Sequence, residues 1–429
     1  MKAEIISISE DFLNGQQPDE NVVFLAREFL KLGIPVNGSV FVRSSRETLK
    51  RALKQAEEVA DVIVLVGGLG PVKDNITKLA VSEYFDVPLA LDQPTEDKII
   101  TYHKNSDFVM PEHNQLQALI LHDSTPIRNV TGLAVGMFYT SNNKTYILLP
   151  GPADELQPTF SENARPLIVE KLLNETYVET RVVRAFGLSE TQLKMKLEEV
   201  IHYENPVVTV FEYGEELEVL IVVTASDEEK ANKQVDELQE EVKRRIKEFV
   251  YSEESNTLLE TVRDLLLKEE LKITAAESLT GGDLLSTFAS LDGASDIFDG
   301  GMVTYSNEVK NKNLGVPKKV IEQFGVVSGQ CAIEMAERVQ EKFAADIGVS
   351  LTGVAGPSSL EGEIPGTVWI GIAKEGMTSF AKKYHFAYKR NRNRKLSVMS
   401  ALDLVRRVIL QEDVADTVTM AEADDNVNK

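Results

Sequence analysis

Hydrophobic positions change their spacing several times along the chain, and the changes mark out strands and helices. In residues 1–174, short apolar runs alternate with segments whose apolar residues recur every three or four positions. The clearest example is an amphipathic segment over 45–59, followed by the continuous apolar run 61–66. Another helix is predicted over 22–32, ending at Gly33. This alternation predicts a three-layer α/β/α domain with a largely parallel sheet.

The pattern changes between about residues 175 and 251. It predicts a strand, a helix, two strands and a second helix. Capping boxes starting at Ser189 and Ser226 open the two helices, which we expect to run to Ile201 and to about Phe249. Two paired strands are expected between the helices, over 207–211 and 217–223. This part of the chain is predicted to be a small α+β connector domain.

A second α/β domain is predicted over residues 252–411. An amphipathic helix over 257–270 precedes a strand over 271–276, and another helix starts at Asp283. Further elements are a strand over 301–305, a helix over 308–314 and a helix over 330–343. Beyond them, residues 412–429 are acidic and lack any apolar period, and we expect a disordered tail.

The charge and the cysteine and histidine content of the chain exclude several kinds of partner and site. The chain has 429 residues and a formal net charge of −22, which argues against nucleic-acid or anionic-membrane binding but allows a small phosphorylated ligand in a locally basic pocket. The single cysteine, Cys331, excludes internal disulfides and cysteine-based zinc sites, and the five histidines lack metalloprotease spacing. With no signal-peptide pattern or membrane-length apolar run, we expect a cytoplasmic protein.

Ser278 is the first candidate for chemistry. It falls on the turn between the strand over 271–276 and the helix that starts at Asp283, where unpaired backbone N–H groups gather. Gly281 and Gly282 would let a substrate approach the backbone, and the helix N-terminus favours an anion such as an oxyanion or a phosphate. A serine on such a turn can be a nucleophile if a base activates it. The alternative is that Ser278 and Thr280 only cap the helix.

Lys310 is the candidate base. Asn307 is the expected N-cap of the helix over 308–314, which places Lys310 in the first turn. A cation there opposes the helix dipole, so its pKa should fall, the more so if the amine is buried. A neutral amine could take the hydroxyl proton of Ser278, and Tyr305 could relay that proton or hold the ammonium. The alternative is a solvated surface lysine.

Several separated motifs agree with one known family. The segments resemble, in order, the C-terminal domain of the CinA (competence/damage-inducible) family: Ala276-Glu277-Ser278-x-Thr280-Gly281-Gly282, Gly293-Ala294-Ser295, Thr304-Tyr305-Ser306-Asn307-Glu308-x-Lys310, Thr352-Gly353-Val354-Ala355-Gly356-Pro357 and Pro365-Gly366-Thr367-Val368. The resemblance implies an amidase of pyridine-nucleotide salvage that hydrolyses the carboxamide of nicotinamide mononucleotide to the acid and ammonia. It implies no cofactor or metal for that reaction.

The resemblance also implies roles for individual residues. Ser278 would be the nucleophile, Lys310 the base and Tyr305 its partner. Substrate contacts would come from Thr280, Gly281, Gly282, Ser295, Thr352, Gly353 and Arg390. The chain departs from the family where Leu279 replaces a cysteine and where Tyr388-Lys389 replaces the Gly-Asp before the family's arginine, which leaves the register of Arg390 and Arg394 open. With Arg392 and Lys395, these arginines form a basic cluster suited to a phosphate.

The first domain carries a second candidate site. The apolar strand over 61–66 leads into Gly67-Gly68-Leu69-Gly70-Pro71, at the strand end where such sheets bind ligands. This part resembles the molybdopterin-binding-like N-terminal domain of the same family, some of whose members cleave ADP-ribose at its pyrophosphate. The candidate nucleotide and divalent-metal residues are Gly67, Gly68, Gly70, Asp74, Asn75 and Thr77.

Departures from the family gather at this second site. Asn75 replaces an aspartate, Val72 replaces a threonine, and Ser9 begins an altered segment, so we expect the fold to be kept and the pyrophosphatase activity to be reduced or lost. Alternatively, Asp74 and Asn75 cap a helix over 76–85. The connector resembles the KH-like domain of the family but lacks the Gly-x-x-Gly clamp and is acidic, which favours a structural or dimerising role. The resemblance to the family implies a homodimer.

Three functions therefore remain open on the sequence. The first is an amidase in the C-terminal domain, acting on a small-molecule nucleotide. The second is a metal-dependent ADP-ribose pyrophosphatase in the N-terminal domain. The third is a protein that binds nucleotides without turning them over.

Overall fold

The computed structural model describes residues 1–15, 19–72, 75–105, 114–174, 176–202 and 204–420. The chain divides into two compact units, the first made of Met1–Thr180, Glu204–Pro206 and Val222–Asp236, and the second of Arg181–Tyr203, Val207–Ile221 and Glu237–Lys429. The division passes through strands β9 (Tyr177–Ala185) and β11 (Glu216–Ala225) and helix α9 (Glu228–Ile246). None of the described helices has the length and apolar character needed to cross a membrane.

The N-terminal domain is built on a six-stranded sheet of order β2-β1-β3-β8-β7-β6. The four strands from β2 to β8 are parallel, and β7 and β6 add an antiparallel edge. The predicted α/β class is confirmed, and the antiparallel edge is a mixed-sheet feature that the sequence pattern did not predict. The strands are β1 (Ala3–Ile8), β2 (Val36–Val42), β3 (Val62–Val66), β6 (Thr125–Ile127), β7 (Gly136–Ser141) and β8 (Lys144–Leu149).

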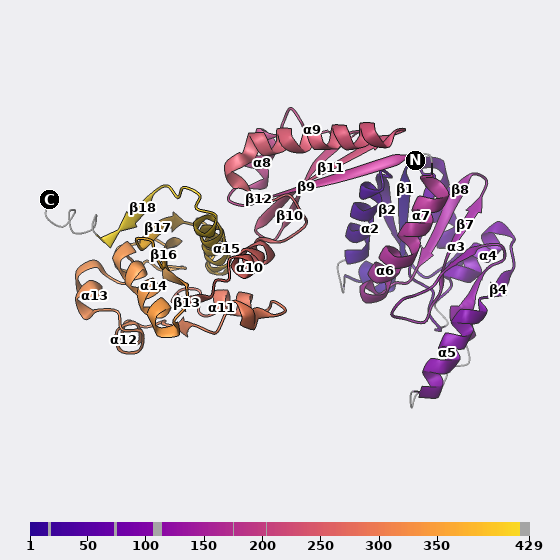
Figure 1. Ribbon diagram of the computed structural model, residues 1–429. Helices are drawn as coiled ribbons and strands as arrows, with labels where there is room; N and C mark the ends of the chain where they lie inside the picture. The colour runs from indigo at the N-terminus through magenta and orange to yellow at the C-terminus, as the bar shows by residue number, and fades with distance from the viewer. Residues whose placement is uncertain (16–18, 73–74, 106–113, 175, 203, 421–429) are drawn as a thin grey trace. The chain divides into compact units, whose positions relative to one another are not determined.

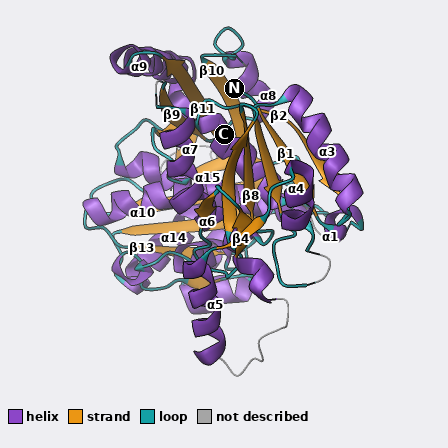
Figure 2. Ribbon diagram, turned by 90° about the vertical axis from the view of Figure 1, so that its right-hand side faces the viewer, coloured by secondary structure: helices purple, strands orange, loops and turns teal. Residues whose placement is uncertain are grey.

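Helices cover both faces of this sheet because successive strand residues point to opposite sides. Ile5 packs with Phe29 of α2 (Glu20–Lys31), whereas Ile6 packs with Leu49 of α3 (Arg46–Val59). Helices α6 (Ala153–Thr159) and α7 (Arg165–Leu172) lie on the α2 face, and α4 (Thr77–Phe85) lies on the α3 face. Figures 1 and 2 show this layering, with α5 (Gln93–Asn105) projecting from the domain in both views.

Short elements complete the N-terminal domain. They are α1 (Glu10–Leu13), the two-stranded pair β4 (Leu89–Leu91) and β5 (Leu119–Leu121), the 3₁₀ turn η1 (Asn114–Ala118) and the π-helical turn η2 (Phe160–Ala164).

The connector forms a four-stranded sheet of order β10-β11-β9-β12. The predicted order of strand, helix, two strands and helix is confirmed, and β12 is an additional strand. Helix α8 opens with the expected capping box, because Ser189 Oγ accepts the N–H of Gln192 at 3.3 Å. It ends at Lys196 rather than at the expected Ile201. The remaining elements are α8 (Glu190–Lys196), β10 (Val207–Tyr213), η3 (Lys247–Phe249) and β12 (Val250–Ser252).

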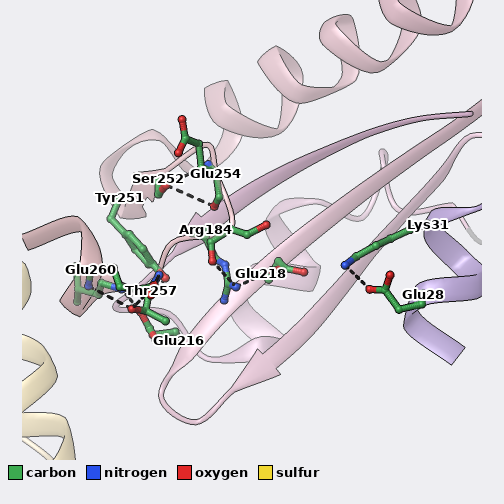
Figure 3. A network of polar contacts seen from close by, with 12 residues as sticks. Glu28, Lys31, Arg184, Glu216, Glu218, Tyr251, Ser252, Glu254, Thr257 and Glu260 are labelled. Atoms are coloured by element: carbon green, nitrogen blue, oxygen red, sulfur yellow. Dashed lines mark hydrogen bonds and ion pairs between the residues drawn. The ribbon is translucent and has the colours of Figure 1, made fainter. Parts of the chain in front are cut away.

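Buried charges join the strands of the connector to each other and to the C-terminal domain (Figure 3). Arg184 on β9 lies 2.9 Å from the carboxylate of Glu218 on β11, and both side chains are almost fully buried. Glu216, also buried, accepts the hydroxyl of Tyr251 at 2.7 Å and the N–H of Leu258 at 2.5 Å. Because Leu258 begins α10 (Leu258–Lys268), Glu216 ties the connector to the first helix of the C-terminal domain.

The C-terminal domain has a second six-stranded sheet, of order β14-β13-β15-β16-β17-β18. Strands β14, β13 and β15 are parallel, and β16, β17 and β18 continue antiparallel. The strands are β13 (Ile273–Glu277), β14 (Met302–Val303), β15 (Ile347–Gly353), β16 (Thr367–Lys374), β17 (Phe380–His385) and β18 (Thr417–Thr419).

Helices again cover both faces. Ala275 of β13 packs into a core shared with α10, α11 (Asp283–Ala289) and α15 (Arg390–Ile409), whereas Ala276 packs against α14 (Gly329–Phe343). Cys331 is fully buried in α14. The remaining elements are η4 (Ala294–Asp296), α12 (Asn307–Val309), η5 (Lys310–Leu314) and α13 (Lys318–Phe324).

The segment after α15 differs from expectation. A disordered tail was predicted from residue 412, but Thr417–Thr419 form β18, which pairs with β17 from Lys382 to Phe380. The prediction is wrong for these residues because the edge of β17 supplies the hydrogen-bond partners that an isolated acidic segment lacks. Residues 421–429 lie outside the described part of the chain.

Candidate active site

The turn after β13 is held by a buried carboxylate. Glu277 is fully buried, and its two oxygens accept the N–H groups of Gly282, Leu284 and Leu285 at 3.0, 3.2 and 2.7 Å. The helix α11 is therefore capped by Glu277, not by Ser278 or Thr280 as the capping alternative required. Because Glu277 caps the helix, the hydroxyl of Ser278 is not needed for capping and is available for chemistry.

Ser278 directly follows the carboxyl end of β13, the central one of the three parallel strands. Its own N–H donates to the carbonyl of Leu351 on β15 at 2.9 Å, which fixes the backbone. Gly281 and Gly282 have φ values of 65° and 101°, a left-handed conformation that glycine adopts without strain, so the chain can turn sharply into α11. The predicted strand-to-helix turn is confirmed.

Lys310 contacts the candidate nucleophile directly. Its Nζ donates to Ser278 Oγ at 2.9 Å and to the carbonyl of Thr304 at 2.8 Å. Lys310 is 1% exposed and Ser278 is 8% exposed. The two residues, 32 positions apart in the chain, are thus brought together by the adjacent strands β13 and β14, and the predicted proximity is confirmed. The alternative of a solvated surface lysine is wrong.

Burial sets the electrostatics of Lys310. Loss of solvent lowers the pKa of its ammonium below the ordinary value, and the nearby Cys331 and Glu361 offset part of this change. The N-cap of the local helix is Ser306, which accepts the N–H of Val309 at 3.3 Å, and not the expected Asn307. The helical segment here is short and becomes π-helical from Lys310 onward, so desolvation rather than a long helix dipole carries the effect.

Tyr305 lies elsewhere than expected. It is 61% exposed, and its hydroxyl accepts a hydrogen bond from Arg390 at 3.1 Å. The partner of Lys310 is instead the backbone carbonyl of Thr304, the preceding residue. The structure therefore does not support Tyr305 as the group that holds the ammonium of Lys310.

The donors available for an oxyanion also differ from expectation. The N–H of Gly281 already donates to the carbonyl of Ser278 at 3.1 Å, and that of Gly282 donates to Glu277. Within the described residues, the N–H groups of Leu279 and Thr280 have no hydrogen-bond partner, and the buried hydroxyl of Thr280 has none either. The free donors of the turn thus belong to Leu279 and Thr280, while the two glycines shape it.

Two arginines of α15 reach this turn. Arg390 donates to the carbonyl of Gly356 at 2.8 Å as well as to Tyr305, and Arg394 donates to the carbonyl of Thr280. Arg392, between them in sequence, faces away toward Glu215, whose carboxylate lies 3.3 Å from the guanidinium. The basic cluster predicted from the sequence is therefore divided, and Arg394 belongs with Arg390 at the site.

Three other predicted substrate contacts, Thr352, Gly353 and Ser295, do not lie together. Thr352 is buried, and its hydroxyl donates to the carbonyl of Val326 at 2.6 Å, while a side chain at Gly353 would collide with the Thr367 carbonyl on β16. Thr352 therefore holds the end of β15 in place, and Gly353 allows β16 to approach it closely. Ser295 is exposed and lies near Ile297, whose carbonyl accepts the N–H of Ile273 at the start of β13. It is thus at the opposite end of the strand from Ser278, contrary to expectation.

Two carboxylates were missed by sequence reasoning. Glu277 occurs next to the nucleophile, yet nothing in the pattern indicated that it would be buried and would cap α11. Glu361 accepts the N–H groups of Val326 and Val327 at 2.7 and 3.2 Å and lies close enough to influence Lys310. Its role depends on a loop between β15 and β16 whose course has no periodic signal.

The glycine turn of the N-terminal domain lines a separate cavity of about 510 Å³. Gly67 has a φ of 92°, and Thr77 donates from its hydroxyl to the Gly67 carbonyl at 2.8 Å, so this threonine holds the turn. Gly68, Gly70 and Asn75 also line the cavity, and Asp74 lies outside the described residues.

The capping alternative for this turn fails at Asn75, because the N-cap of α4 is Ile76 and has no side-chain hydrogen bond. No group of three or more histidine, cysteine, aspartate or glutamate side chains that could hold a metal occurs within the described ranges. A divalent metal at this turn therefore stays an expectation from the sequence.

Comparison with protein families gives three matches along the chain. Residues 4–170 match the family described as "Probable molybdopterin binding domain", residues 180–252 match the damage-inducible protein CinA KH domain, and residues 255–409 match the CinA C-terminal domain. The matches follow one another in the order that the sequence patterns predicted.

Two similar proteins match this chain over almost their whole length. A competence-damage inducible protein of Listeria welshimeri is 40% identical over 408 residues, covering 95% of this chain and 98% of that protein. Another, from Lactiplantibacillus plantarum, is 38% identical over 417 residues, covering 96% and 99%. A solved structure, the competence-damaged protein superfamily protein from Escherichia coli, is 31% identical over 36% of this chain and 88% of its own, with a TM-score of 0.34. These descriptions state no reaction.

Proposed function

The chain belongs to the CinA family of competence- and damage-inducible proteins, and on this premise we propose that it is a nicotinamide-nucleotide amidase. The substrate would be nicotinamide mononucleotide, and the products nicotinate mononucleotide and ammonia. The single observation that supports this best is the hydrogen bond between Lys310 Nζ and Ser278 Oγ, made by a buried amine with a lowered pKa. A neutral amine at that distance can act as a general base.

In the first step, Ser278 Oγ attacks the carboxamide carbon while Lys310 takes the hydroxyl proton. The amide oxygen becomes an oxyanion, which the free N–H groups of Leu279 and Thr280 can stabilise. The C–N bond then breaks, and the ammonium of Lys310 returns its proton to the departing nitrogen, so that ammonia leaves and an acyl-serine remains.

In the second step, water attacks the acyl carbon. Lys310 accepts a proton from the water and passes it to Ser278 Oγ as the ester bond breaks. The nicotinate product leaves and the serine hydroxyl is restored. The carbonyl of Thr304 holds the amine of Lys310 in place through both steps.

The arginines of α15 suit the phosphate of the substrate. Arg390 and Arg394 both reach the rim of the Ser278 turn, and guanidinium groups bind phosphate oxygens well. In this proposal Arg390 binds the phosphate, and Arg394 shares that charge while holding the carbonyl of Thr280. Because the chain as a whole is acidic, it repels anions elsewhere, and these arginines would attract the phosphate to this place.

Ammonia release from nicotinamide mononucleotide tests the proposal. We expect release by the full chain in the presence of a chelator, and loss of release in Ser278→Ala and in Lys310→Ala. The exposed Ser286→Ala on α11 is the matched serine control and should keep wild-type turnover. Wild-type turnover in either site variant would refute the mechanism. Products that require a divalent metal and come from ADP-ribose would instead favour the pyrophosphatase, and binding without products would favour a nucleotide-binding protein.

A further inference from the structure

A second cavity, of about 620 Å³, lies within the second compact unit and contains none of the residues of the candidate active site. The connector strands and the turn between them form one wall, and β17 with one face of α15, from Arg392 to Arg407, forms another. A volume of this size is typical of pockets for small organic ligands. Neither the proposed reaction nor the family matches assign a role to it.

Aromatic rings give the cavity flat walls. Tyr384 and Phe386 stack with their ring centroids 5.8 Å apart and an interplanar angle of 17°. Tyr388 lies under the guanidinium of Arg392, 4.2 Å from the ring centroid. Phe186 lines the cavity from the connector side. Because Tyr384 and Phe386 stack on each other, a planar ligand would stack against this pair from the cavity side.

The charged residues that line the cavity favour one sign of charge on the ligand. Six lining residues are acidic and three are basic. Each basic group already has an acceptor. The pairs are Arg392 with Glu215 at 3.3 Å, Arg407 with Asp403 at 2.8 Å, and Lys382 with the carbonyl of Ala415 at 2.8 Å. An anionic ligand would therefore have to displace an existing partner.

Two of the acidic groups have no such partner. Over the described ranges, the carboxylates of Glu212 and Asp413 make no hydrogen bond or ion pair, and both residues are exposed at the cavity. A cation on the ligand would gain an attractive partner there without breaking a contact within the protein. Phosphorylated molecules, including the substrate proposed above, are disfavoured at this place.

We propose that this cavity is a binding site for a planar aromatic molecule that carries a positive charge. The ring stacks against Tyr384 and Phe386, and the cation faces Glu212 and Asp413. The site is separate from the Ser278 site, and its occupation does not depend on the amidase reaction.

Titration calorimetry on the full chain with three indoles tests the proposal. Tryptamine carries a positive side chain, tryptophol a neutral one and indole-3-acetate a negative one. We expect tryptamine to bind about tenfold more tightly than indole-3-acetate, with tryptophol between them, and the difference to shrink at high salt. Equal binding of the three probes, or no binding of tryptamine, would overturn the proposal.

Variants locate the binding. Leu396→Trp, on the half-buried part of α15 that lines the cavity, should abolish tryptamine binding, whereas Leu267→Trp on α10, outside the lining, should not. The double variant Glu212→Gln/Asp413→Asn changes exposed residues only and should lower tryptamine affinity to that of tryptophol, leaving tryptophol binding unchanged. Tryptamine binding that survives Leu396→Trp, or that is unaltered in the double variant, contradicts the assignment. The double variant keeps the test decisive if Leu396→Trp fails to fold.

Discussion

The amine of Lys310 lies 2.9 Å from the hydroxyl of Ser278, in a place where neither side chain is appreciably exposed. In water the lysine would be charged and could not accept a proton. Burial between β13, β14 and α14 removes the solvent that stabilises the charge. Burial therefore favours the neutral amine, the form that can accept the hydroxyl proton of Ser278.

The variant Lys310→Arg tests whether Lys310 is needed for its positive charge or for its ability to accept a proton. Arginine keeps a positive charge but stays protonated, so it cannot take the proton of Ser278. We expect kcat for amide hydrolysis to fall by about 100-fold or more, the range attributed to a general base. The control is Lys312→Arg, an exposed residue two positions away that pairs with Glu308. Steady-state ammonia release measures both, and a similar effect in the two variants would point to a general disturbance of this segment.

The pH profile should reflect the lowered pKa of Lys310. The active form is the neutral amine, which forms as pH rises through the pKa of Lys310 in the folded protein. We therefore expect kcat/KM to rise with pH and to level off below the ordinary lysine range of about 10.4. Measurement of kcat/KM from acid to alkaline pH tests this, and activity that decreases as the amine deprotonates would contradict a neutral base.

Glu277→Gln should loosen the turn without altering its size. The amide keeps one acceptor oxygen for three N–H groups, so at least one buried donor loses its partner at a cost of about 1–3 kcal/mol. We expect a lower melting temperature and a lower kcat, because the N–H groups of Leu279 and Thr280 lose their fixed direction. Glu308→Gln, on an exposed carboxylate, is the matched control. Calorimetry and turnover should show both effects for Glu277→Gln alone.

Substitutions of the arginines of α15 should affect substrate binding differently, according to the position of each arginine. Arg390→Ala removes a cation that lies at the site, and we expect KM for nicotinamide mononucleotide to rise about tenfold or more, the loss of a charge-assisted hydrogen bond. The effect on nicotinamide riboside, which lacks the phosphate, should be small. Arg392→Ala faces Glu215 and should leave both KM values near wild type. An equal loss for both substrates would place Arg390 away from the phosphate.

The buried pair of Arg184 and Glu218 offers a test of stability in the connector. Arg184→Met leaves the carboxylate of Glu218 buried without its cation, and we expect a loss of about 3–5 kcal/mol. The double variant Arg184→Met/Glu218→Met removes both charges and should recover much of that loss. Thermal unfolding of the three proteins measures the difference, and a double variant less stable than the single one would mean that the pair is favourable in itself.

Local patterns in the sequence predicted a large part of the fold. Apolar runs such as 61–66 and capping boxes such as that at Ser189 depend on neighbouring residues only, so strands, helices and the Ser278 turn could be assigned. The end of α8 was placed at Ile201 instead of Lys196, and the strand β18 was missed, because packing and an available sheet edge decided them. Ser278 and Lys310 were found because their motifs are contiguous and resemble a known family.

By itself the sequence determined most of the strands and helices, and which two residues carry the candidate chemistry. The tertiary structure alone decided the partners. Arg394 holds a carbonyl 114 positions away, Glu277 caps the helix in place of a serine, and Tyr305 binds an arginine rather than the base. The physical reason is that secondary structure depends on the spacing of nearby side chains, whereas burial and hydrogen-bond partners depend on which distant segments the folded sheet brings side by side.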